Sequence, residues 1–121
     1  MAAQFRVRIG AGAQAVHHTL RECMAHVELV SEDVYRSAGG KDYIAVLLYQ
    51  QYFIRVGNQV ALMLLISGDS QTTTVKSVAC ASSRDILLSF DLGAAGDFAA
   101  EPINLLRDLY PGRVYEVPSQ G

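Results

Sequence analysis

Three residues at four-residue spacing, His18, Glu22 and His26, carry the clearest pattern for metal chemistry in this sequence. Residues four apart share one face of a helix, and imidazole and carboxylate groups are common ligands of divalent metals. His17 points about 100° away from His18 on a helix of 3.6 residues per turn, so it cannot join that face. A solvated helix surface with one His–Glu pair explains the same spacing. We therefore predict no metal and no other cofactor, and keep these three residues as the candidate ligands if a metal binds.

Nucleophilic and acid–base catalysis each lack a complete set of residues. Cys80, or a serine of the 82–83 turn, would need a base beside it, and all three histidines fall within one predicted helix over 12–26. The carboxylates of Glu32, Asp33 and Asp85 are candidates for an acid and a base, but turns and strand edges commonly carry such charges. Because no GxSxG turn or similar motif pairs a nucleophile with a base, we predict no catalytic residues and favour a non-enzymatic protein.

The charge balance argues against nucleic acid as a partner. Ten Lys and Arg residues face 12 Asp and Glu residues, for a net charge of −2, whereas phosphate backbones are captured by a surplus of basic side chains. Arg6 and Arg8 stand on the polar side of a predicted strand, as ordinary surface charges do. The Gly10-Ala11-Gly12 turn lacks the third glycine and the GK[ST] ending of phosphate-binding loops. We expect no nucleic-acid partner.

Aromatic residues concentrate in one segment, where they are candidates for a binding or interface surface. Tyrosine and phenylalanine give large, rigid contact areas and are enriched at interfaces and in ligand pockets. A plain cluster of core aromatics explains the same concentration equally well. The candidate residues are Tyr43, Tyr49, Tyr52 and Phe53.

Length and composition describe one folded domain over residues 1–121, with 118–121 frayed. The chain is 50% hydrophobic and 18% charged, which excludes intrinsic disorder. The longest apolar run, 60–66, is far shorter than the roughly 20 residues that cross a bilayer, so we expect no membrane association. Arginines interrupt the apolar residues of the N-terminus, unlike a signal peptide. Cys23 and Cys80 are too few for a disulfide scaffold, and we expect both to be reduced and buried in a cytoplasmic protein.

Hydrophobic periodicity indicates the elements that must position these residues. Alternating or β-branched runs predict strands over 4–9, 27–36, 42–56, 60–66, 71–82 and 86–92, with a short edge strand over 113–117. Spacings of three and four predict helices over 12–26 and from about 101 to 110. We predict an α+β fold: an antiparallel sheet of five to seven strands with two helices on one face, in the order β-α-β(4–5)-α. This order resembles TATA-binding-protein-like folds, which include the helix-grip proteins.

The predicted strand over 42–56 is apolar on both alternating sets of residues, which is typical of a strand buried on both faces. Two helices can cover only one face of the sheet, and monomers seldom expose large apolar patches. Our leading prediction is therefore a self-associating domain, a homodimer that buries the helix-free face through residues such as Tyr49 and Tyr52. The alternative is a helix-grip type binder of a small apolar ligand, in which the sheet curls over a pocket closed by the second helix.

A resemblance to a known family covers residues 25–109. Its motifs are the segment Gly57-Asn58-Gln59-Val60-Ala61-Leu62 after the tyrosine-rich strand, the small-residue strand over 77–83, and Leu88-Ser89-Phe90-Asp91-Leu92 before the leucine-rich helix. These resemble a family of small uncharacterised bacterial proteins, a domain of unknown function. The resemblance implies a stand-alone bacterial domain and supplies no catalytic or binding residues.

Overall fold

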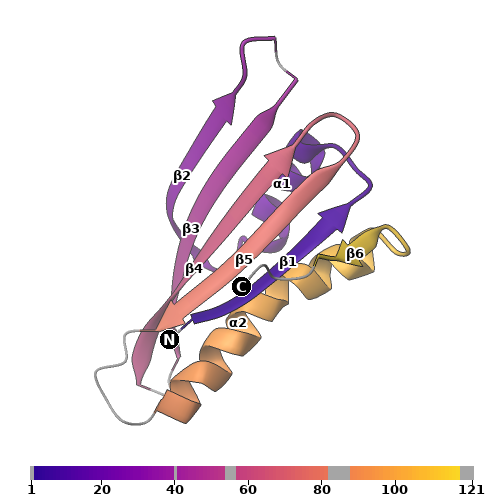
Figure 1. Cartoon of the computed structure of the whole chain (residues 1–121). Helices are drawn as coiled ribbons and strands as arrows, with labels where there is room; N and C mark the ends of the chain where they lie inside the picture. Colours follow the sequence, from indigo (N-terminus) through magenta and orange to yellow (C-terminus); the bar gives the residue numbers. More distant parts are fainter. Residues whose placement is uncertain (1, 40, 54–56, 82–87, 118–121) are drawn as a thin grey trace.

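A six-stranded antiparallel sheet with two helices behind it forms the structure, a computed structural model that describes residues 2–39, 41–53, 57–81 and 88–117 (Figure 1). It is α+β, as the sequence predicts. No helix among the described residues is long and apolar enough to span a membrane. The elements follow the chain as β1 (Ala2–Ile9), α1 (Ala13–Cys23), β2 (Glu28–Arg36), β3 (Tyr43–Phe53), β4 (Asn58–Gly68), β5 (Thr73–Ala81), α2 (Leu88–Leu109) and β6 (Val114–Glu116).

The sheet has the order β2-β3-β4-β5-β1-β6. Strands β2 to β5 are consecutive antiparallel neighbours, and β1 pairs antiparallel with the free side of β5. The short β6 then pairs with β1 at Val7–Ile9 only. Because side chains alternate between the two sides of a strand, every strand sends one set of side chains toward the helices and the other set away from them.

The core lies between the sheet and the helices. Helix α1 buries an apolar stripe at the spacing that the sequence predicts, Ala13, Val16 and Leu20. Helix α2 lies along β1, β5 and β4 and buries Phe98, Ala99, Ile103 and Leu106. The sheet side of this core consists of the helix-facing residues of β1, β3, β4 and β5: Val7, Ile9, Tyr43, Ala45, Leu47, Tyr49, Val60, Leu62, Leu64, Ile66, Val75, Ala79 and Ala81.

The turn between β4 and β5 is built on Gly68 and Asp69. A Cβ atom at Gly68 would collide with the backbone of Thr72 and Thr73, so only glycine fits there. The Asp69 carboxylate accepts the backbone N–H groups of Gln71 and Thr72 at 2.7 and 2.9 Å, and these hydrogen bonds lower the pKa of Asp69. The turn lies beside the start of α1, because the Ala13 N–H donates to the Asp69 carbonyl at 2.9 Å.

The sequence interpretation is wrong for the stretch before the C-terminal helix. The predicted strand over 86–92 is helical from Leu88 onward, and residues 86 and 87 lie outside the described residues. Leu88 and Leu92 are four apart, so the same apolar residues fit a helix as well as a strand. The helix also begins 13 residues before the expected start at Glu101, and Pro102 lies inside it.

Small residues of β5 lie beneath α2. Ser77, Ala79 and Ala81 are buried beneath the helix, and their short side chains let the helix backbone come close. The Ser77 hydroxyl donates to the Ala99 carbonyl at 2.8 Å. Pro102 has no N–H to donate to the Phe98 carbonyl four residues earlier, and the Ser77 hydroxyl adds a hydrogen bond to the next carbonyl of the same turn.

Candidate functional site

One side of the sheet carries no helix, and we call it the open face. It consists of the residues that alternate with the buried ones, and its exposed aromatic and aliphatic side chains include Ile44 (38% exposed) and Tyr52 (53%). The centre of the open face is apolar across three neighbouring strands. These central residues are Val46 and Leu48 of β3, Met63 and Leu65 of β4, and Val78 of β5, all half-buried.

Charges of opposite sign flank this apolar centre. In one row across the sheet, Asp33 of β2 is followed by two apolar residues and then by Lys76 of β5 and Arg6 of β1. Arg8 adds a further cation on β1. Among the described residues, Asp33, Lys76 and Arg6 make no ion pair. The open face therefore carries a carboxylate on one side of the apolar centre and three cations on the other.

The structure divides the four aromatic candidates between the two sides of the sheet. Tyr43 and Tyr49 are 9% and 1% exposed and point toward the helices. Phe53 also packs on that side, against Phe98 with ring centroids 5.4 Å apart. Only Tyr52 lies on the open face. The prediction that Tyr49 lies on the helix-free face is therefore wrong. Tyr49 is two residues from the buried Leu47 in β3, so both side chains point to the same side of the sheet.

A polar cluster lies on the helix side, where side chains of α1 reach side chains of β2 and β3. The His17 ring is hydrogen-bonded at both nitrogens: Nδ1 lies 2.6 Å from the Tyr43 hydroxyl and Nε2 lies 2.5 Å from the Glu32 carboxylate. Arg21 donates to the other oxygen of Glu32 at 2.6 Å. His17 is only 9% exposed. The cluster thus connects α1 to both strands through charged and polar groups.

The electrostatics of the cluster keep Glu32 ionised. Burial raises the pKa of Glu32, but the hydrogen bonds from His17 and Arg21 and the charge of Arg21 together outweigh it, so the pKa is lowered. The neighbouring Tyr49 hydroxyl is buried and has no hydrogen-bond partner among the described residues. Burial raises the pKa of Tyr49, with Arg21 opposing the rise and Glu32 adding to it. Tyr49 therefore belongs to the same electrostatic environment.

We expect Glu32→Gln to make the free energy of unfolding less dependent on pH at acidic pH. A carboxyl whose pKa is lowered by folding contributes stability above its ordinary value of 4.5, and this contribution is lost as pH falls through the folded value. The wild type should lose about 2 kcal/mol more than the variant between pH 7 and pH 3, the range for hydrogen bonds to a charged group. Urea unfolding at several pH values measures this. The same loss of unfolding free energy between pH 7 and pH 3 in both proteins would contradict this prediction. Glu22→Gln, at an exposed position, is the control.

The sequence singled out Glu32 but separated it from its partners. The direction that keeps His17 off the face of His18 turns it toward the core side of α1. Its spacing from Ala13 and Leu20, four before and three after, places it on the edge of the buried stripe. That spacing was the signal for a buried histidine, but nothing in the sequence pairs it with Tyr43.

The structure does not bring the three metal candidates together. His18 pairs with Glu22 at 3.0 Å, but α1 ends at Cys23 and His26 instead pairs with Glu101 of α2 at 2.7 Å. Across the part of the chain that is described, no three His, Cys, Asp or Glu residues are grouped as metal ligands.

The remaining catalytic candidates are also dispersed. Glu32 and Asp33 are adjacent in β2 and point to opposite sides of the sheet, so they are no acid–base pair. Cys80 is exposed rather than buried, because it lies on the open face, and Cys23 is half-buried. Ser82, Ser83 and Asp85 lie outside the described residues.

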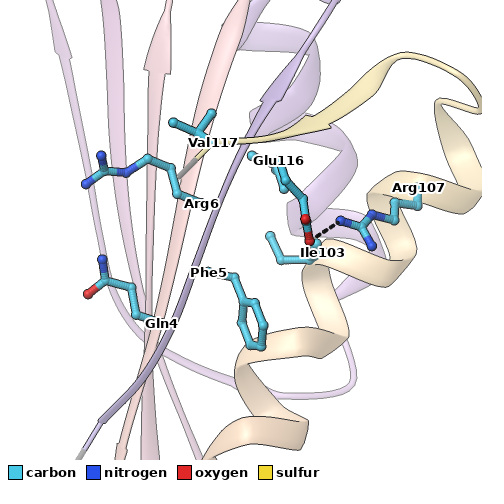
Figure 2. Close-up of a pocket in the computed structure, with 8 residues that line it drawn as sticks. Gln4, Phe5, Arg6, Ile103, Arg107, Glu116 and Val117 are labelled. Carbon is cyan, nitrogen blue, oxygen red and sulfur yellow. Dashed lines mark hydrogen bonds and ion pairs between the residues drawn. The ribbon is translucent and has the colours of Figure 1, made fainter. Parts of the chain in front are cut away.

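A groove of about 460 Å³ lies where β1, α2 and β6 meet (Figure 2). Phe5 points from β1 toward Ile103 of α2, whereas Gln4 and Arg6 point to the other side of the strand. Phe5 is 39% exposed, and an ion pair between Arg107 and Glu116, 3.2 Å apart, lies beside it. The groove therefore offers an exposed aromatic ring next to a paired cation.

Comparison with known proteins places the chain in a family without assigning it an activity. None of the curated proteins compared with it matches. Among solved structures, it is similar to the ZhuI aromatase/cyclase from Streptomyces sp. R1128, with a TM-score of 0.36 and 10% identity over 92% of this chain and 96% of that chain. The family model of DUF6054, described as a family of unknown function, matches residues 2–110. The chain therefore belongs to DUF6054, which confirms the prediction of a family of unknown function.

Proposed function

We propose that this chain is a self-associating domain and that a second copy covers its open face. The observation that carries the proposal is the charge pattern of that face: an apolar centre with Asp33 on one side and with Lys76 and Arg6 on the other. Such a surface is complementary to itself, as the two-fold symmetric interface of a homodimer requires.

The charge pattern also selects one orientation of the two copies. A two-fold axis parallel to the strands and running along β4 would place β2 of one copy over β1 of the other, since these strands are equally far from β4 in the sheet order. Asp33 would then lie over Arg6 of the second copy, in the same row. An axis perpendicular to the strands would instead place basic strands over basic strands, and like charges brought together disfavour association.

Sheet packing supports an interface of this kind. Two sheets pack face to face about 10 Å apart, with side chains of the facing sides interdigitating. The half-buried Val46, Leu48, Met63, Leu65 and Val78 would lose their remaining exposure to water in this arrangement, at about 25 cal/mol per Å² of apolar surface.

Native mass spectrometry of the untagged protein, with a denatured control, tests the proposal. We expect a species of twice the 13.1 kDa chain mass. Tyr52→Asp places a charge on the open face and should shift the population toward monomer. Leu109→Asp is the matched control, because Leu109 is similarly exposed, at 51%, but lies on α2. A wild-type monomer would overturn the proposal. So would a dimer that Tyr52→Asp, Asp33→Arg and Arg6→Asp all leave intact.

A second candidate function, binding of a small apolar ligand, rests on the groove of Figure 2. Phe5 is exposed there, beside Ile103 and the Arg107–Glu116 ion pair. The same experiment distinguishes the two functions, because a monomer with an extra mass that disappears on denaturation would support ligand binding. Phe5→Ser should then remove the extra mass while leaving the chain folded.

A further inference from the structure

The polar cluster on the helix side has the arrangement of a proton-transfer chain. Ionised Glu32 accepts the Nε2–H of His17, and a neutral imidazole then has only the lone pair of Nδ1 to offer to Tyr43. In that tautomer the Tyr43 hydroxyl is the donor in the 2.6 Å contact. Enzymes activate hydroxyl groups with an imidazole base that a carboxylate holds in place. Tyr43, His17 and Glu32 are arranged in the same way.

Tyr43 has access to a groove from this position. A groove of about 490 Å³ along α1 is lined by His17, Arg21 and Tyr43, among others. A neighbouring depression of about 360 Å³ shares Gln14 and Tyr43 with it. Tyr43 thus stands where the two meet, with its hydroxyl held by His17.

A cation stands over the same phenol. The Arg36 guanidinium carbon lies 5.3 Å from the centre of the Tyr43 ring, and Arg36 makes no ion pair with another described residue. Lys41 lines the depression beside it. A guanidinium at this distance favours negative charge developing on the phenol, and its free N–H groups match a carboxylate.

We propose that Tyr43 is the reactive group of an acid–base site for small carboxylate-bearing molecules, with His17 as its base and Glu32 and Arg21 as positioning residues. As Tyr43 Oη takes a proton from a bound molecule, the phenolic proton passes to His17 Nδ1, so that the molecule is left as its conjugate base and His17 as an imidazolium. Glu32 stabilises the resulting imidazolium. This site lies on the helix side of the sheet, so it does not depend on the proposed dimer.

Acetylation by N-acetylimidazole tests the reactivity of Tyr43 without a known substrate. Tyr43 Oη forms a bond to the acetyl carbon, the bond from that carbon to the reagent's ring nitrogen breaks, and the phenolic proton reaches the departing imidazole through His17. Digestion and mass spectrometry then give the rate at each tyrosine. Tyr35, Tyr52 and Tyr115 are 59%, 53% and 60% exposed, whereas Tyr43 is 9% exposed.

We expect Tyr43 to be acetylated at least about tenfold faster than these exposed tyrosines, against the order of exposure. His17→Asn should slow Tyr43 by roughly 100-fold, the typical contribution of a positioned base, and leave the other tyrosines unchanged. His18→Gln, on the exposed side of α1, is the control. Rates that follow exposure in the wild type would overturn the proposal, and this comparison needs no variant to fold.

Benzoate tests the ligand class. It should slow acetylation of Tyr43 in the wild type and have no such effect in Arg36→Gln, while the rates at Tyr52 and Tyr115 stay constant. Equal protection of the wild type and the variant, or none in either, would overturn the assignment of Arg36 to a carboxylate.

Discussion

Phe98→Ala should destabilise the fold by about 3–5 kcal/mol, the range for truncating a buried phenylalanine. Phe98 is 1% exposed at the middle of α2, and its ring packs edge-to-face with that of Phe53 at an interplanar angle of 62°. Removing the ring leaves a cavity between α2 and the sheet and also loses this aromatic contact. For a chain of this length, such a loss lowers Tm by more than about 10 °C.

Thermal and urea unfolding followed by circular dichroism measure this loss. Leu109→Ala is the control on the same helix, since an exposed side chain there should change stability by less than about 0.5 kcal/mol. A cost below about 1 kcal/mol for Phe98→Ala would contradict the packing of α2 against the sheet.

The position of Phe98 also shows where sequence patterns are ambiguous. Asp97 and Pro102 suggested a helix start near Glu101, because aspartate caps helices and proline is comfortable in a first turn. The helix nevertheless includes both residues, since Phe98, Ala99 and Ile103 all face the core from it. Burial of this apolar surface outweighs the local preference of one proline, and the Ser77 hydroxyl adds a hydrogen bond from β5 to the Ala99 carbonyl.

The sheet was more predictable than the candidate site. Strict alternation fixes which residues of β3 share a side, so the opposite directions of Tyr49 and Tyr52 follow from counting along the strand. Which side the helices cover does not follow from β3, because both of its residue sets are apolar. The contact of His17 with Tyr43 and Glu32 joins residues 26 and 15 positions apart, and such a contact depends on how α1 crosses the strands. The sequence carries no local signal of that crossing.

Charge reversal on the open face should weaken the proposed dimer by roughly 10- to 100-fold in Kd. Asp33→Arg replaces an attraction to Arg6 of the second copy with a repulsion, and two-fold symmetry makes the change twice per dimer. The equivalent loss of about 1.4–2.8 kcal/mol is consistent with a pair at the partly exposed side of an interface. Analytical ultracentrifugation over a dilution series measures Kd. Arg6→Asp should weaken the dimer to a similar degree.

Mixing the two charge-reversal variants separates a specific orientation from a general effect of charge. In a heterodimer of Asp33→Arg with Arg6→Asp, one contact pairs the two new residues and the other pairs the two native ones, so both contacts are attractive. We therefore expect the mixture to form a dimer with nearly the wild-type Kd although neither variant does so alone. If the two-fold axis lay perpendicular to the strands, position 33 would not meet position 6 and mixing would restore nothing. Failure of the mixture to dimerise would thus exclude the orientation that places β2 over β1.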